Sequence, residues 1–195
     1  VQIELENAET IAALAAATEA KDPFTKGHTV RGAEKAVALG KALHLPNDKL
    51  RVLARAGLLH DIGKLGIPDS ILLKPGPLTA EEFRAMKEHP HLGLEILQRV
   101  GSLEREIKVV KAHHERMDGT GYPDGVAGEE LPIEARVVAV ADVWDSLSSN
   151  RPYRKALPVE QVREILKQSA GSHLDPQVVE ACLKQITGGS SKETK

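Results

Sequence analysis

Histidines and aspartates recur along this chain at intervals that suit metal binding. His60 and Asp61 are adjacent in the segment LLHDIGKLGIPD, at the predicted end of a helix that runs into a glycine. His28 lies upstream of them. The further candidates, in HPHLG, HHER and AVADVWD, are His89, His113, His114 and Asp142. Each predicted helix with its following loop therefore supplies about one imidazole or carboxylate donor.

These donor types indicate a catalytic rather than a structural metal site. Neutral imidazoles and carboxylates suit zinc, iron, manganese or cobalt, and the single cysteine, Cys182, disfavours a structural zinc site. Seven candidate donors are too many for one catalytic ion and about right for two, and an aspartate beside a histidine could bridge both. Two ions about 3.5–4 Å apart clamp the attacking and leaving oxygens of a phosphate ester. The pattern therefore favours hydrolysis of a phosphate ester.

The other histidines are interpreted differently. His44, His91 and His173 stand alone, and an isolated histidine is more often a surface or capping residue than a ligand. The doublet His113-His114 follows Val109 and Val110 on a helix that should pack through its valines. Two consecutive imidazoles there need a shared polar partner, and a metal ion would be one.

Composition restricts the class of protein. The chain has 195 residues, which corresponds to about one domain. Aromatic residues make up only 3%, so the core must be built from Leu, Ile, Val and Ala, which favours close helix packing. The formal net charge of -2 argues against a nucleic-acid platform and a membrane-surface patch. With one cysteine and no run of 18 apolar residues, we expect a cytoplasmic protein, or the cytoplasmic domain of a membrane-anchored sensor.

Helical periods separated by proline, glycine and capping residues predict an all-α fold, because no convincing alternating strand pattern occurs. The segment 64–77, rich in proline and glycine, is predicted to be a loop that acts either as a lid over substrate or as a rigid connector. The predicted helices cover 8–20, 25–43, 46–61, a stretch from a capping box at Thr79 and Glu82 toward His89, then 92–99, 103–115, 133–148, 159–168 and a last helix capped by Asp175.

The segment HHERMDGTGYP, residues 113–123, reproduces the signature HHExxDGxGYP. Together with HDIGKLGIPD and the downstream RPYR, it makes the chain resemble the HD-GYP domain family over residues 20–183. The resemblance implies an HD-superfamily helical bundle with a buried di- or trinuclear metal centre. It also implies hydrolysis of the bacterial second messenger cyclic di-GMP to pGpG and, in many members, to GMP. We expect a leading signalling helix at 1–20, the HD-GYP domain at 21–187 and a disordered tail at 188–195.

The resemblance also implies the roles of individual residues. Lys64 matches the family's catalytic lysine, which stabilises charge on the phosphate oxygens, although a solvated cation at a helix end is the alternative. Members with a third ion hold it with a glutamate where this chain has Phe24, so we expect two ions, iron or manganese first, with zinc, cobalt and nickel also accepted. The implied ligands are His28, His60, Asp61 and Asp142 for one ion and Asp61, His89, His113 and His114 for the other, with Asp61 as the bridge.

Substrate contacts are expected from two segments. Arg151 and Arg154 match family positions that contact the phosphodiester and guanine, and a guanidinium fork suits both groups. Tyr122 matches the tyrosine of the GYP motif, whose ring could stack on a base or order the loop.

The resemblance implies partners as well. We expect cyclic di-GMP as the substrate, and an N-terminal sensor or receiver domain joined through the leading helix. A homodimer and a diguanylate cyclase of the GGDEF type are further expected partners, whereas nucleic acid and direct membrane insertion are not expected. Two alternatives stay open: a non-catalytic cyclic-dinucleotide receptor or interaction module, and a phosphodiesterase for another cyclic dinucleotide such as 3',3'-cyclic GMP-AMP.

Overall fold

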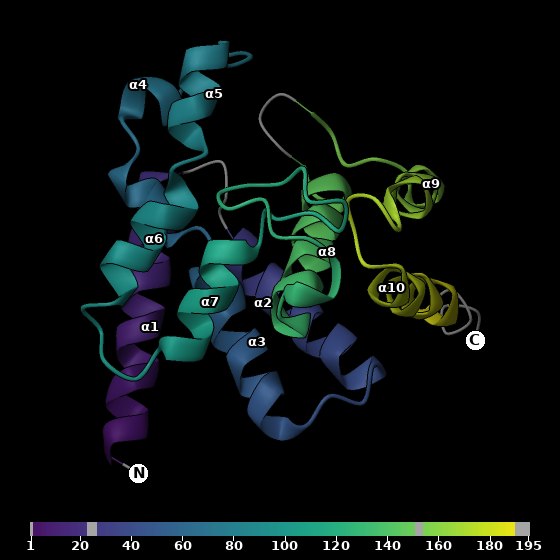
Figure 1. Cartoon of the computed structure of the whole chain (residues 1–195), viewed down its shortest axis with the longest axis horizontal. Helices are drawn as coiled ribbons and strands as arrows, with labels where there is room; N and C mark the ends of the chain where they lie inside the picture. The colour runs from purple at the N-terminus through teal and green to yellow at the C-terminus, as the bar shows by residue number, and fades with distance from the viewer. Residues whose placement is uncertain (1, 23–26, 151–153, 190–195) are drawn as a thin grey trace.

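The chain folds into a bundle of helices, which confirms the predicted all-α class (Figure 1). The computed structural model describes residues 2–22, 27–150 and 154–189. Within these ranges no strand is formed, an isolated β-bridge joins Ala170 to Leu174, and Arg154 is a further bridge residue. No described helix has the length and apolar content needed to cross a membrane. The helices are α1 (Gln2–Lys21), α2 (His28–Ala42), α3 (Asn47–Leu59), η2 (Ile62–Gly66), α4 (Asp69–Leu72), α5 (Ala80–Met86), α6 (His89–Leu97), α7 (Glu104–Ala112), η3 (Gly128–Glu130), α8 (Ile133–Ser148), α9 (Val159–Ser169) and α10 (Pro176–Gly189).

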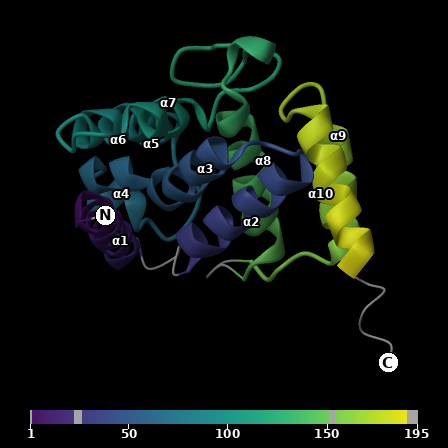
Figure 2. The same ribbon diagram turned by 90° about the horizontal axis from the view of Figure 1, so that it is seen from below.

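The larger core cluster is centred on α2, α3 and α8. Helix α2 packs against both α3 and α8, and Figure 2 shows α2 and α3 side by side. Gly57 permits this close approach, because a Cβ atom there would lie 2.6 Å from the Cα atom of Ala33. Helices α9 and α10 contribute Val162, Leu166 and Val178 to the same cluster. Small and aliphatic side chains thus build this core, as the low aromatic content predicts.

A second core cluster lies where α1 meets the rest of the bundle. Ile11 of α1 is buried in it together with Leu59, Ile62 and Val110, among others. At the end of α1, the Nζ atom of Lys21 donates hydrogen bonds to the main-chain carbonyls of Leu65 and Ile67, at 2.6 and 2.8 Å. Helix α1 therefore packs on the bundle and supports the short η2 helix.

Two details of the predicted helix pattern are wrong. The segment 64–77 is not a continuous loop: η2 extends into it, with the amide of Lys64 donating to the carbonyl of Asp61, and α4 follows Pro68. The helix predicted over 103–115 ends at Ala112. The helix ends here because Nδ1 of His113 forms a hydrogen bond with the carbonyl of Val110. In a continued helix that carbonyl would accept from the amide of His114.

Candidate metal centre

Three histidines of the predicted series share one local arrangement. Each Nδ1 atom lies within hydrogen-bond distance of the carbonyl three residues earlier, at 2.8 Å for His60, 2.8 Å for His89 and 2.6 Å for His113. Since a carbonyl only accepts, the ring proton belongs on Nδ1 in each case. The Nε2 atom of each ring is then an unprotonated acceptor, which is the form that binds a metal ion.

These Nε2 atoms have no satisfactory partner in the protein. His60 Nε2 is buried without a hydrogen bond. His89 Nε2 and His113 Nε2 lie 3.4 Å apart, although neither carries a proton in the arrangement above. Buried acceptors that face one another are unfavourable unless a cation lies between or beside them. The donor set therefore fits metal ions.

The predicted donors form two groups. One contains Asp61, His89, His113 and His114, and the other contains His28, His60 and Asp142; in each group the donor atoms lie within 4.8 Å of one another. The seven residues predicted from their types are thus brought together by five segments of the chain. His44, His91 and His173 belong to neither group.

Asp61 lies between the two groups. Its Oδ1 atom is 3.6 Å from His89 Nε2, whereas its Oδ2 atom is 3.5 Å from His60 Nε2 and 3.9 Å from His28 Nε2. Each oxygen thus faces a different group, which is the geometry that a bridging carboxylate requires.

The side-chain surroundings set the protonation states of the first group. Burial lowers the pKa values of His89, His113 and His114, that of His114 to about 4. Burial opposes ionisation of Asp61, but Lys64 and the neighbouring imidazoles hold its pKa well below the usual range. At neutral pH this group therefore presents neutral imidazoles and an ionised carboxylate, the states that a divalent ion needs.

His28 differs because two carboxylates contact it. Its Nδ1 atom lies 2.7 Å from Asp145 Oδ2, and its Nε2 atom lies 3.2 Å from Asp142 Oδ1. Burial opposes its charge, but hydrogen bonds with both carboxylates raise the pKa of His28 to about 9. In the metal-free protein this imidazolium supplies the positive charge between the two aspartates.

Asp145 was not predicted from the sequence. It is buried, and Arg31 fixes it from the other side, with Nε 2.6 Å from Oδ1 and Nη2 3.0 Å from Oδ2. Asp145 follows Asp142 by three residues on α8, so the two carboxylates share a helix face, and this spacing was the available signal.

Lys64 and a second unpredicted aspartate complete the centre. The Nζ atom of Lys64 is 2.8 Å from Asp61 Oδ2 and 3.3 Å from Asp22 Oδ2. Lys64 is therefore not the freely solvated cation of the alternative interpretation. A cavity of about 380 Å³ opens here, lined by Lys64 and Asp22, by the donors His28, Asp61, His89, His114 and Asp142, and by Leu72, Met86, Tyr122 and Ser146.

The loop after the histidine doublet is held by Glu115, another residue whose role was not predicted. Glu115 is buried, and its Oε1 atom accepts hydrogen bonds from the amides of Asp124 and Gly125 at 2.7 and 3.0 Å. The loop returns Tyr122 to the centre, where its ring stacks on His114 with centroids 4.8 Å apart and planes at 27°. Tyr122 thus contacts a candidate metal ligand and also lines the cavity.

The predicted substrate residues are only partly described. Arg151 lies outside the described residues, as does Phe24. Arg154 is half-buried and donates hydrogen bonds to the carbonyls of Ser146 and Leu147 at the end of α8. Since Ser146 lines the cavity, Arg154 lies beside the centre.

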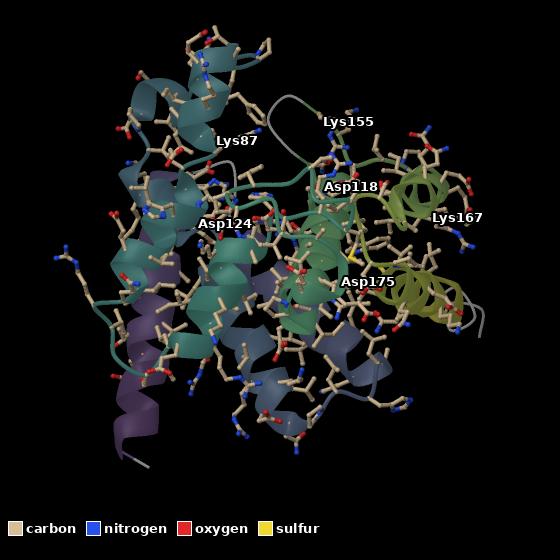
Figure 3. The ribbon with its side chains drawn as sticks, in the orientation of Figure 1. Lys87, Asp118, Asp124, Lys155, Lys167 and Asp175 are labelled. Atoms are coloured by element: carbon tan, nitrogen blue, oxygen red, sulfur yellow. The ribbon has the colours of Figure 1, made fainter. Side chains whose placement is uncertain are left out.

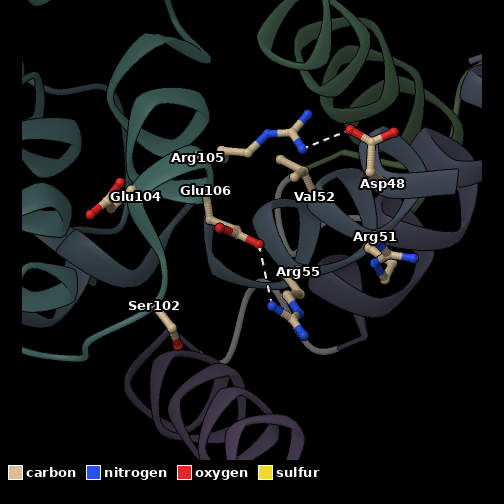
Figure 4. A pocket seen from close by; sticks show the side chains of 8 residues that line it. All are labelled: Asp48, Arg51, Val52, Arg55, Ser102, Glu104, Arg105 and Glu106. Atoms are coloured by element: carbon tan, nitrogen blue, oxygen red, sulfur yellow. Dashed lines mark hydrogen bonds and ion pairs between the residues drawn. The ribbon is translucent and has the colours of Figure 1, made fainter. Parts of the chain in front are cut away.

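A separate cavity of about 330 Å³ between α3 and α7 contains mixed charges rather than metal donors (Figure 4). Arg105 pairs with Asp48 at 2.8 Å and with Glu134 at 3.0 Å, and Arg55 pairs with Glu106 at 3.6 Å. The acidic and basic side chains that line this cavity largely compensate one another. We therefore take the histidine cluster, and not this cavity, as the candidate functional site.

Comparisons with known proteins agree with this geometry. A family model described as an HD domain matches residues 12–178. The cyclic di-GMP phosphodiesterase response regulator RpfG of Xanthomonas campestris is 43% identical over 187 residues, which cover 94% of this chain and 49% of that protein. The 3'3'-cGAMP-specific phosphodiesterase 3 of Vibrio cholerae is 38% identical over 168 residues, covering 86% of this chain and 36% of that protein. The chain therefore spans at most about half the length of these two relatives.

A solved structure shares the fold. Bd1817, an HDG"Y"P protein from Bdellovibrio bacteriovorus, matches with a TM-score of 0.68 and 23% identity, covering 83% of this chain and 52% of that chain. The HD domain model covers most of the sequence, and the histidines and GYP tyrosine of the HHERMDGTGYP segment lie in the centre. The chain thus belongs to the HD domain family, in its HD-GYP branch.

Proposed function

We propose that this domain is a metal-dependent phosphodiesterase that hydrolyses cyclic di-GMP to pGpG, with GMP as the alternative end product. The observation that carries the proposal is the pair of donor groups joined by Asp61 on the wall of an open cavity. The cavity of about 380 Å³ lies within the size range of small-ligand sites. The name of the Xanthomonas campestris relative supports the choice of substrate.

We assign the donors to two ions. His28, His60, Asp61 and Asp142 would hold one, and Asp61, His89, His113 and His114 the other. Iron or manganese is our first assignment, and the same nitrogen and oxygen donors accept zinc, cobalt or nickel. Two such ions would polarise the phosphodiester and lower the pKa of the attacking water.

Lys64 is the proposed catalytic cation. Burial would lower the pKa of its ammonium group, but the carboxylates of Asp61 and Asp22 raise it, so Lys64 is charged at neutral pH. Its position on the cavity wall lets it donate to a phosphate oxygen as negative charge develops there.

Arg151, Arg154 and Tyr122 are the proposed substrate-binding residues. Two nitrogens of Arg154 donate to main-chain carbonyls, and a guanidinium group has five N–H donors, so donors remain for a phosphate. Tyr122 offers a ring at the cavity wall, although one of its faces stacks on His114.

A second candidate substrate is 3',3'-cyclic GMP-AMP. The Vibrio cholerae relative, which is 38% identical, is named for specificity toward that dinucleotide, and the metal chemistry serves any phosphodiester. The third candidate, a non-catalytic receptor, is weakened because all seven donors are present and grouped.

We also propose that the domain acts in the cytoplasm as the output of a sensor or receiver domain. The Xanthomonas campestris relative is named as a response regulator, which supports this arrangement. A homodimer and a GGDEF-type diguanylate cyclase are the proposed protein partners.

The function can be tested by direct hydrolysis. Protein purified anaerobically is loaded separately with Fe(II) or Mn(II) and given cyclic di-GMP or 3',3'-cyclic GMP-AMP, and the products are separated by chromatography. We expect pGpG and GMP from cyclic di-GMP, and their loss in the His60→Ala/Asp61→Ala variant. His91→Ala is a matched control, because His91 is exposed, pairs with the exposed Glu95 at 3.5 Å and belongs to neither donor group. Two bound metal ions without turnover of either dinucleotide would contradict the proposal.

Metal affinity should rise with pH between about 6.5 and 9. A proton on His28, whose pKa is about 9 in the metal-free protein, must leave before Nε2 can bind an ion. Below pH 9 the affinity for Mn(II) at this group is therefore expected to increase about tenfold per pH unit. Calorimetry in buffers of different ionisation enthalpy would measure both the affinity and the released proton.

Asp145→Asn provides the comparison for this pH dependence. Removing one of the two carboxylates at His28 should lower the pKa of the imidazole and flatten the dependence. It should also weaken metal binding about 10–100-fold near pH 9, because the ring loses the partner that orients it. An affinity that is independent of pH in the unmodified protein would show that His28 is neutral before metal binds.

A further inference from the structure

Lys87 is a cation next to two residues, Met86 and Tyr122, that line the metal-site cavity. It follows α5 directly and comes after Met86, which lines the cavity. Its Nζ atom lies 5.2 Å from the ring centroid of Tyr122 and 5.0 Å from that of Phe83. Figure 3 shows Lys87 at the end of α5, on the side that faces α8. Within the described ranges its ammonium group contacts these two rings and forms no ion pair with a carboxylate.

The other described cations beside the cavity are already engaged. Lys64 lies between Asp61 and Asp22, and Arg154 donates to two main-chain carbonyls. Lys87 therefore contributes a positive charge that forms no ion pair with any described carboxylate. The cation–π contacts hold the ammonium group itself over the two rings, and its N–H groups can still donate hydrogen bonds to an incoming anion.

The proposed substrate contains an anionic group that the metal centre does not use. A cyclic dinucleotide has two phosphodiesters, each with one negative charge, and the centre can act on only one of them at a time. The second phosphodiester enters the same cavity with its charge intact. An ammonium group is a compact charge that suits a phosphate better than the face of a base.

We propose that Lys87 forms an anion subsite for the second phosphodiester of the substrate, at the rim formed by Tyr122 and Phe83. This inference rests on the proposed function, because it requires a substrate with two phosphates. The subsite selects cyclic dinucleotides over single phosphodiesters and orients the ring so that one phosphate reaches the metal centre.

The test compares two substrates in three variants. Lys87→Met keeps an unbranched side chain of similar length beside the rings and removes the charge, and Lys87→Arg restores a charge. Lys108→Met removes the charge of an exposed lysine on α7. The Mn(II)-loaded proteins are given cyclic di-GMP, with two phosphodiesters, or bis(p-nitrophenyl) phosphate, with one. We expect the ratio of kcat/KM for the first substrate to that for the second to fall about tenfold in Lys87→Met, mainly through KM. Lys87→Arg should recover most of the ratio, and Lys108→Met should leave it unchanged.

Binding gives a second readout. Calorimetric titration with a bis-phosphorothioate analogue of cyclic di-GMP, which resists hydrolysis, should show about tenfold weaker binding to Lys87→Met at low salt. The difference should shrink as ionic strength rises. Equal binding to the two proteins, or an equal fall in kcat/KM for both substrates, would overturn the subsite, since the latter would mean that Lys87 acts through Tyr122 and His114.

The two proposals fail in different ways. Cleavage of bis(p-nitrophenyl) phosphate without cleavage of cyclic di-GMP would reject the proposed function. In that case the calorimetric titration alone tests the subsite. A tenfold difference between the unmodified protein and Lys87→Met in binding the phosphorothioate analogue would still support it. Turnover of cyclic di-GMP that is unaffected by Lys87→Met would instead reject only the subsite.

Discussion

Replacing Asp61 with asparagine is expected to lower kcat/KM for cyclic di-GMP by on the order of 10³-fold. The two carboxylate oxygens of Asp61 face different donor groups, with Oδ1 3.6 Å from His89 Nε2 and Oδ2 3.5 Å from His60 Nε2. Asparagine has nearly the same shape, but its amide nitrogen donates hydrogen bonds and cannot bind a cation. One of the two proposed ions therefore loses a ligand, and the centre loses a negative charge.

The same change should also disturb Lys64. Asp61 Oδ2 is the nearer of its two carboxylate partners, at 2.8 Å against 3.3 Å for Asp22. Without that charge the ammonium group loses the interaction that orients it toward the cavity. Loss of the bridging carboxylate and displacement of Lys64 would act together. We therefore expect Asp61→Asn to lower kcat/KM more than replacing Asp145, which positions His28, or Asp22, which positions Lys64.

Metal analysis separates this explanation from simple misfolding. After gel filtration in Mn(II), the Asp61→Asn protein should retain one ion or fewer, whereas the unmodified protein should retain two. Asp69→Asn is the matched control, because Asp69 is an exposed carboxylate on α4 that pairs with Lys21 at 3.6 Å. A fully loaded, fully active Asp61→Asn protein would rule out the bridging role.

The donors could be predicted from the sequence because metal chemistry restricts residue type. His and Asp at recurring positions are recognisable without coordinates, and the structure brings all seven candidates into two groups. Local capping rules also worked: Thr79 and Glu82 form the predicted capping box, and the side chain of Asp175 accepts from the amides of Gln177 and Val178. Such signals depend on residues only a few positions apart.

The residues that orient the donors could not be predicted in the same way. Asp145 contacts His28, which is 117 positions away, and Asp22 contacts Lys64, 42 positions away. A carboxylate becomes a positioning group only when packing buries it beside its partner. The sequence does not show which distant residues will be packed together. Glu115 is similar, because its role depends on a loop that folds back onto its own carboxylate.

Gly63→Ala should be the most destabilising small substitution near the centre. A Cβ atom at Gly63 would lie 1.7 Å from the carbonyl oxygen of His89 and 2.5 Å from the amide nitrogen of Gly93. Both atoms belong to the backbone of α6, so no flexible side chain can move aside. We expect the free energy of unfolding to fall by about 3 kcal/mol, at the upper end of overpacking effects.

The displacement should reach the metal centre as well. Gly63 directly follows Ile62 in η2, one residue before Lys64, whereas His89 begins α6, so separating these two backbones pulls Lys64 and Asp61 away from the His89 imidazole. Urea unfolding of the metal-free proteins measures the stability, and Mn(II) titration measures the affinity. We expect a lower urea midpoint with a similar slope, and weaker binding of the ion held by His89.

Gly32→Ala is the matched control for Gly63→Ala. Gly32 lies within α2, where an added Cβ atom meets no other atom within 4 Å. Alanine is a better helix former than glycine, so this variant should be as stable as the unmodified protein or more stable by up to about 1 kcal/mol. If both variants had the same stability, the backbones of η2 and α6 could move apart without cost. The close contact at Gly63 would then not fix the position of Lys64 relative to His89.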